Sequence, residues 1–181
     1  MPRDDDIDYP LLNLLILEKC GPGFTPLQAM GEWLQHLTYN KIWCAGRYAL
    51  RNRINDLLPP ATASYRNPYR ESLGGQIRCD TWGYTCPGDP ERAAELAYRD
   101  SSMSQVRNGI YSGMFFAAVI AACFTTNDLA EAVEAGLAQI PPRSRLADAV
   151  RHLLGWVRTD RDWKATLERI YQAHGHQMFN Y

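Results

Sequence analysis

The chain has 181 residues, of which 46% are hydrophobic and 22% are charged, and its 19 basic and 20 acidic residues give a net charge of −1 at pH 7. These values are typical of one globular domain, here residues 1–181, and they exclude intrinsic disorder, collagen and a long coiled coil. Because basic residues are not in excess, we expect no nucleic acid and no anionic membrane surface as a partner.

The cysteines and the start of the chain indicate the compartment. No CxxC pair occurs among the five cysteines, which are Cys20, Cys44, Cys79, Cys86 and Cys123. An odd number of scattered cysteines is typical of reduced thiols rather than of a disulfide framework. The chain starts with acidic residues, where a signal peptide would have basic and then apolar ones. We therefore expect a cytoplasmic protein.

Helix start signals recur along the chain, and no run alternates in the way that predicts a strand. Residues 7–19 and 42–57 have helical periodicity, whereas residues 58–69 and 81–88 are expected to be irregular. A polar residue that can cap a helix stands before each further apolar run. The predicted N-caps are Thr25, Asp89, Thr126 or Asn127, Ser144 and Asp160.

The segment between Arg107 and Asp128 has no charged residue. Its strictly apolar part, residues 114–124, is shorter than the ~20 residues that a membrane span needs. Small residues recur every four positions, which allows a neighbouring helix to approach one face closely. They are Gly109, Gly113, Ala117 and Ala121. The sequence therefore predicts an all-α fold, a compact orthogonal helical bundle around this buried small-residue central helix, with no membrane partner.

Asp4, Asp5 and Asp6 precede the first predicted helix. Carboxylates at a helix start are favoured by the helix dipole, so one interpretation is a solvated acidic cap. The other interpretation is a hard-cation site, because Mg²⁺ binds through a few carboxylates and keeps several waters. Such a site would need further oxygens from elsewhere in the fold.

Two further segments have alternative interpretations. The polar residues 101–111 lead into the apolar helix, where backbone N–H groups and hydroxyls could hold phosphate or ribose oxygens; the alternative is an ordinary helix entry. The pair Gly74 and Gly75 indicates close packing or close approach of a ligand. Trp82 and Tyr84 follow and could stack on a ring or belong to the core.

Taken together, these segments resemble the ADP-ribosylglycohydrolase family, which includes the J1-crystallin-like proteins. The resemblance covers nearly the whole chain, and the order of its motifs is specific. The motifs are Asp4-Asp5-Asp6-Ile7-Asp8-Tyr9, Asn67-Pro68-Tyr69-Arg70-Glu71, Gly75-Gln76-Ile77, Trp82-Gly83-Tyr84, Pro87-Gly88-Asp89-Pro90, Ala93-Ala94-Glu95-Leu96-Ala97 and Asn108-Gly109-Ile110-Tyr111.

The resemblance implies an all-α hydrolase with a binuclear magnesium centre. Its substrate would be ADP-ribosylated protein or a small ADP-ribose conjugate, cleaved at the glycosidic bond. Asp4 and Asp5 match the family's metal-binding aspartates, and Asp6 stands at the next polar position. The loop that holds ribose and phosphates would contribute the ligand-binding residues Ser104, Gln105, Asn108, Gly109 and Tyr111.

The resemblance also indicates two departures from the family. The family has a glycine-rich segment that carries a catalytic acid and an Asp-x-Asp-Thr motif that carries further metal ligands, and neither occurs in this sequence. We therefore expect a truncated member in which the catalytic residue is unassigned and the magnesium site is partial. One hypothesis is a hydrolase completed by another chain or by a homo-oligomer. The other is an inactive relative that binds ADP-ribose or has a structural, crystallin-like role.

Overall fold

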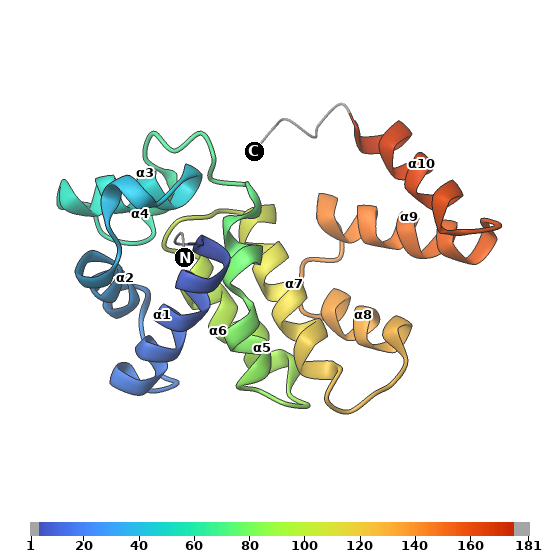
Figure 1. Ribbon diagram of the computed structural model, residues 1–181, viewed down its shortest axis with the longest axis horizontal. Coiled ribbons are helices and arrows are strands. Elements are labelled where there is room, and N and C mark those ends of the chain that lie inside the picture. Colours follow the sequence, from blue (N-terminus) through green and yellow to red (C-terminus); the bar gives the residue numbers. More distant parts are fainter. Residues whose placement is uncertain (1–3, 176–181) are drawn as a thin grey trace.

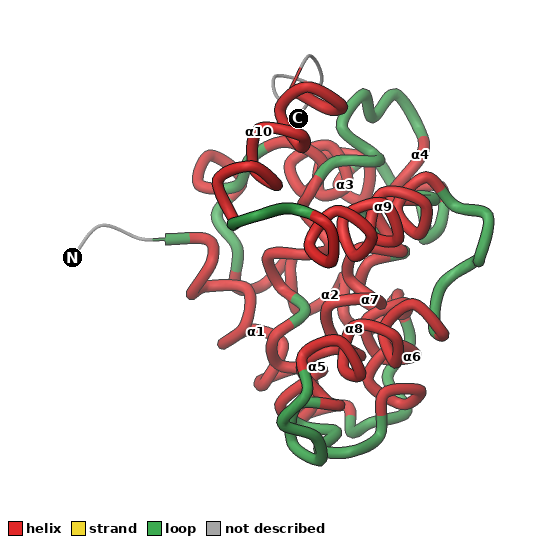
Figure 2. Tube along the Cα trace, turned by 90° about the vertical axis from the view of Figure 1, so that its right-hand side faces the viewer, coloured by secondary structure: helices red, strands yellow, loops and turns green. Residues whose placement is uncertain are grey.

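The computed structural model describes residues 4–175, and within this range it contains helices and loops but no strand (Figure 2). The predicted all-α fold is therefore confirmed. In chain order the helices are α1 (Asp5–Cys20), α2 (Pro26–His36), η1 (Tyr39–Lys41), α3 (Cys44–Ile54), α4 (Ala61–Ser64), η2 (Leu73–Arg78), α5 (Asp80–Tyr84), α6 (Pro90–Ser101), α7 (Asn108–Ala122), α8 (Leu129–Ala138), α9 (Arg145–Thr159) and α10 (Trp163–His174).

Three of the predicted N-caps are confirmed. Thr25 and Gln28 form a complete capping box at the start of α2. The Asp89 carboxylate accepts a hydrogen bond from the Arg92 backbone N–H, and the Ser144 hydroxyl accepts one from Ala147. Each cap satisfies an N–H group that the helix itself leaves without an acceptor.

Two predicted N-caps are wrong by one or two residues. Asp128 caps α8, because its carboxylate reaches the backbone N–H of Ala130 at 2.8 Å, whereas Thr126 donates to the Glu131 side chain. Asp162 caps α10 in the same way. The predicted cap Asp160 instead ends α9, and its carboxylate pairs with Arg169 on α10.

The two stretches expected to be irregular both contain short helices. The first holds α4, and the second begins with most of α5, so each prediction is wrong for part of its range. Both helices are held by tertiary contacts. The buried Thr62 donates to the Met103 carbonyl, and Thr81 donates to the Pro10 carbonyl. Helices this short are marginal alone, which explains why local sequence signals do not reveal them.

Helix α7 is the central helix of the bundle, as predicted. It lies among α5, α6 and α8, while α3 and α9 run across its direction (Figure 1). Its small-residue face is buried, and a Cβ atom at Gly113 would lie 2.9 Å from the Gly75 carbonyl oxygen. The absence of a side chain there allows η2 to approach α7 closely. No helix within residues 4–175 is long and apolar enough to cross a membrane.

The apolar core has a large part and a small part. The large cluster joins α1, α2, α3, α5, α6 and α7 and contains the fully buried Trp33 and Trp82. The small cluster lies where α7, α8 and α9 meet, around Phe115 and Ala147. Helices α9 and α10 extend from the main body (Figure 1).

A methyl group at Gly113 is expected to destabilise the bundle. The Gly113→Ala Cβ would lie 2.7 Å from the Ser101 Oγ as well as close to Gly75, so the backbone must shift. We expect unfolding free energy to fall by about 1–3 kcal/mol in urea denaturation. The control is Gly155→Ala in α9, where nothing lies within 4 Å of the added atom. It should raise stability by up to about 1 kcal/mol, and equal losses in both variants would contradict the close-approach argument.

Candidate functional site

The acidic triad, Asp4, Asp5 and Asp6, lies at the N-terminus of α1. Asp4 is the N-cap, and its Oδ1 accepts a hydrogen bond from the Asp6 backbone N–H at 3.1 Å. One carboxylate oxygen from each aspartate lies within 4.8 Å of the others. Asp4 and Asp6 are exposed and Asp5 is half-buried, so a cation could reach all three from solvent.

The electrostatics of the triad favour a cation. The pKa of Asp6 is raised above its ordinary value by the limited loss of solvation at the helix start, and further by the negative charges of Asp5, Asp4 and Asp80. Asp80 begins α5, so this fourth carboxylate reaches the triad through tertiary packing. Mutual repulsion of this kind disfavours the ionised form of a carboxyl, and a bound divalent cation would relieve it.

A cavity of about 240 Å³ adjoins the triad at Asp5. Three separate parts of the chain form its walls: the first turn of α1, the start of α3 and the residues of η2. The lining residues are Asp5, Tyr9, Trp43, Cys44, Ala45, Gly46, Ser72, Leu73, Gly74, Ile77 and Arg78. The walls are mainly apolar and aromatic, with a carboxylate on one side. The volume is below the ~300–1,000 Å³ of a whole small-molecule site and suits one ring of a larger ligand.

The wall at α3 is tightly constructed. A Cβ atom at Gly46 would lie 2.7 Å from the Tyr9 hydroxyl, so a larger residue here would require the Tyr9 ring to move. Cys44 has a φ of 45°, a left-handed backbone conformation that side chains rarely adopt. Burial and the charge of Asp5 raise the pKa of the Cys44 thiol, so this thiol is not activated as a nucleophile.

Behind the cavity, the fully buried Arg78 connects the elements of the site. Its Nε lies 2.6 Å from the Asp100 carboxylate, and Nη2 donates to the Asp100 carbonyl and the Ser104 hydroxyl. Nη1 donates to the Gly74 carbonyl in the cavity wall. The guanidinium also lies over the Trp33 ring, 4.8 Å from its centroid. One side chain therefore fixes η2 against the last turn of α6 and the residues that follow it.

Ser104 and Gln105, predicted to bind ligand, lie in the interior. Ser104 is fully buried, and its hydroxyl accepts from Arg78 at 2.9 Å. The Gln105 side chain lies between two glycines: a Cβ atom at Gly74 would be 2.5 Å from Nε2, and one at Gly109 would be 2.6 Å from Oε1. Neither amide atom of Gln105 has a hydrogen-bond partner in the described chain. Gly74 lines the cavity and packs against Gln105, so Gln105 contacts the back of the cavity wall but does not enter the cavity.

The other predicted ligand residues face α9. Asn108 donates to the Glu71 carboxylate at 3.1 Å and accepts from the Leu146 backbone N–H at 3.2 Å. Its side chain lines a wide groove of about 900 Å³ that is also bordered by Arg145, which pairs with Glu71. Tyr111 is half-buried and packs in the small apolar cluster. The structure therefore places Asn108 at this groove and Tyr111 in the small apolar cluster, rather than at the triad.

The remaining aromatic predictions divide in two. Trp82 belongs to the core, stacked on Phe24 with ring centroids 5.1 Å apart, whereas Tyr84 is exposed. Sequence reasoning missed the cavity residues Tyr9, Trp43 and Cys44, which are brought together by packing. The one sequence signal for the cavity is the Gly74–Gly75 pair in the η2 wall, which interrupts a helical stretch.

An all-α bundle with an acidic cluster at the start of its first helix can be compared with known protein families. The ADP-ribosylglycohydrolase family model matches residues 4–180, so the chain belongs to the ADP-ribosylglycohydrolase family. Neither the search of curated proteins nor that of solved structures found a match. Family membership supports an ADP-ribosylglycohydrolase-like function in general and ADP-ribosylated substrates as a class.

Loss of the buried ion pair should be far more costly than loss of an exposed one. Asp100→Asn leaves the Arg78 guanidinium without a carboxylate at a site where both side chains are 1% exposed. We expect a loss of about 3–5 kcal/mol in urea unfolding. The control is Glu95→Gln, whose carboxylate pairs with Arg92 and Arg99 on the surface of α6 and should cost below about 1 kcal/mol. If Asp100→Asn lowered the free energy of unfolding no more than Glu95→Gln does, the Arg78–Asp100 pair would not be what holds the site together.

Proposed function

We propose that the chain binds Mg²⁺ at Asp4, Asp5 and Asp6 and hydrolyses the glycosidic bond of ADP-ribosylated protein or a related ADP-ribose conjugate. The observation that carries the proposal is the position of Asp5, which belongs to the acidic triad and also lines the adjoining cavity. A ligand seated in the cavity would therefore meet the Asp5 carboxylate directly, next to the other two. Membership of the family supports the choice of substrate class.

The residues present fit a hard cation. The triad offers only carboxylate oxygens, the ligands that Mg²⁺ prefers, and three of them together with Asp80 concentrate negative charge on one side of α1. The chemistry that magnesium supplies in such a site is charge stabilisation and orientation of hydroxyl groups.

The protein's own groups position the substrate. Tyr9, Trp43 and Ile77 form apolar walls that exclude water from a sugar ring in the cavity. A carboxylate of the triad that is not holding a cation could accept a proton from water. Cleavage at the anomeric carbon develops positive charge on the sugar, which the negative charge of the triad would favour.

A second candidate function is binding of ADP-ribose without turnover. Within residues 4–175 the triad is the one group of three metal-ligating side chains close enough to share an ion. A two-ion centre needs more carboxylates than this group offers, from other residues or from another chain. The cavity alone could still hold part of an ADP-ribose molecule.

The direct test is release of ADP-ribose from a modified protein, followed by chromatography with and without Mg²⁺. We expect turnover that depends on magnesium and falls at least about tenfold in Asp5→Asn, because that variant loses a carboxylate shared by the triad and the cavity. Asp56→Asn is the matched control, since its side chain is 99% exposed on the loop after α3. Binding of ADP-ribose in calorimetry with no turnover would support the second candidate instead.

Magnesium affinity should depend on pH in a specific direction. Because the pKa of Asp6 is raised above 3.8, protons compete for the triad at a higher pH than for an ordinary carboxyl. Affinity measured by calorimetry should therefore decrease as pH is lowered toward that raised pKa and be constant well above it. Asp6→Asn should bind more weakly but with a smaller pH dependence, and an unchanged dependence in this variant would contradict the assignment.

A further inference from the structure

Positive charge is concentrated in one part of the chain. Residues 39–70 contain six basic residues and one acidic residue, so the rest of the chain is correspondingly acidic. This segment comprises η1, α3, α4 and the loops that join them. The net charge of −1 is the sum over the whole chain and does not show that positive charge is concentrated in residues 39–70. The Asp5 carboxylate lies at the start of α3, so the basic residues that a ligand could meet are those farther along the helix and in the loop after α4.

Aromatic rings are interleaved with these charges. The Arg47 guanidinium lies 5.0 Å from the Trp43 ring centroid and 5.8 Å from that of Tyr39. Arg51 lies 4.6 Å from the Tyr48 ring, and Arg66 lies 5.4 Å from the Tyr65 ring. A guanidinium over a ring fixes its orientation and leaves the other ring face available.

These pairs form one continuous strip. Trp43, Arg47 and Arg51 are spaced by four residues and so share one face of α3 and its start. Arg51 Nη2 lies 3.3 Å from the carbonyl oxygen of Arg66, which joins α3 to the loop after α4. We call the set of Tyr39, Trp43, Arg47, Tyr48, Arg51, Tyr65 and Arg66 the arginine–aromatic strip.

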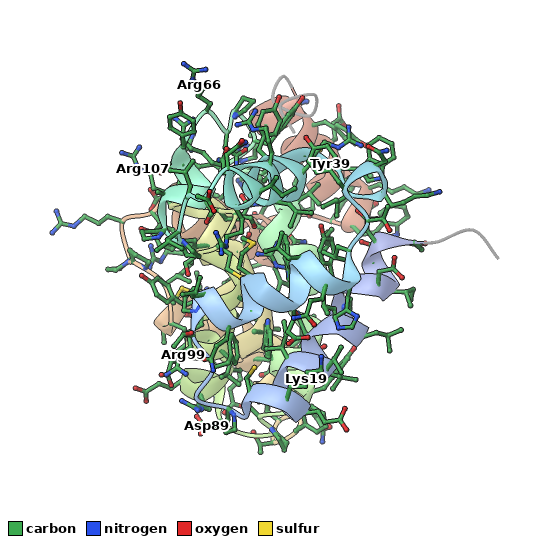
Figure 3. The ribbon with its side chains drawn as sticks, turned by 90° about the vertical axis from the view of Figure 1, so that its left-hand side faces the viewer. Lys19, Tyr39, Arg66, Asp89, Arg99 and Arg107 are labelled. Atoms are coloured by element: carbon green, nitrogen blue, oxygen red, sulfur yellow. The ribbon has the colours of Figure 1, made fainter. Side chains whose placement is uncertain are left out.

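The charges of the strip are not neutralised within the described chain. No carboxylate of residues 4–175 lies within ion-pairing distance of Arg47, Arg51 or Arg66. Arg47 and Arg51 donate instead to neutral oxygens, such as the Ile42 carbonyl and the Asn52 amide. Arg66 is exposed and projects away from the molecule (Figure 3). The positive charge therefore remains available to an external anion.

The rings are accessible as well. Trp43 is 61% exposed, Tyr65 48% and Tyr39 37%, so their rings can be reached from solvent. Beside Arg51 and Arg66 the surface has a depression bounded by Asn55 and Tyr65. A ligand that combines negative charge with planar rings would use both properties of the strip.

We propose that the arginine–aromatic strip binds single-stranded nucleic acid. Successive phosphates would meet the three guanidinium groups, and unstacked bases would lie on the exposed faces of Trp43 and Tyr65. A single strand fits better than a duplex, because only unpaired bases expose faces that can stack on surface rings. The proposal does not depend on magnesium or on hydrolysis. Trp43 also lines the proposed substrate cavity, so the arginine variants, whose residues lie outside that cavity, are the ones that separate this proposal from the proposed function.

The test is fluorescence anisotropy with a labelled oligothymidylate of about twelve nucleotides, at about 50 mM salt and with EDTA present. We expect saturable binding that weakens as salt is raised. Trp43→Ala should lose at least about fivefold in affinity through lost stacking. The double variant Arg47→Gln/Arg66→Gln should bind more weakly at low salt and show a salt dependence reduced by about 0.7 per lost phosphate contact.

The matched control removes two exposed arginines outside the strip, in Arg143→Gln/Arg158→Gln. It should bind as the unchanged protein does, and all variants are first compared by circular dichroism and thermal melting. Arg66→Gln alone tests the proposal if the change at Arg47 disturbs α3. Absence of binding at low salt, equal loss in the control, or equal affinity for a duplex would overturn the proposal. Retention on anionic vesicles without binding of the oligonucleotide would do the same.

Discussion

The buried guanidinium of Arg78 constrains the rest of the structure. A charge without access to water must be paired and must have its N–H groups satisfied, or the fold loses several kcal/mol. Its partners are a carboxylate, a hydroxyl and carbonyl oxygens drawn from η2, from Asp100 in the last turn of α6 and from Ser104 after it. The Asn13 side chain of α1 donates to the Arg78 carbonyl, so the helix that carries the acidic triad is tied to the same residue.

This arrangement explains why η2 can serve as a wall. A 3₁₀ segment with adjacent glycines is weak by itself, since glycine loses much conformational freedom on folding. Here Gly75 packs against α7 and Gly74 against Gln105, while Arg78 holds the last turn. Segment η2 thus lies between the small-residue face of α7 and the cavity, and it packs against both. The close approach of η2 to α7 therefore fixes the position of the cavity wall that η2 forms.

Features that depend on near neighbours in sequence could be predicted. The caps at Thr25 and Asp89 and the small-residue stripe of α7 are local patterns, and the acidic triad is contiguous. The misplaced caps at Asp160 and Thr126 show the limit of local signals, because several polar residues compete there and geometry selects one. The cavity could not be predicted, since its residues from α1, α3 and η2 are joined only by packing. Nor does a sequence show that Ser104 is already occupied by Arg78.

Helices α9 and α10 differ from the rest of the bundle in how little they bury. Among their described residues only Ala147 and Thr166 are fully enclosed, and the ties at the start of α9 are Asn108 to Leu146 and Glu71 to Arg145. Segments with few enclosed contacts open locally at a smaller free energy than global unfolding requires. Because α9 still packs on α7 and α8 through the small apolar cluster, we expect this pair to open more readily than the Arg78-centred body rather than to be independent of it. Amide hydrogens of α9 and α10 would then exchange with solvent through partial opening, and the width of the groove beside Asn108 would fluctuate with it.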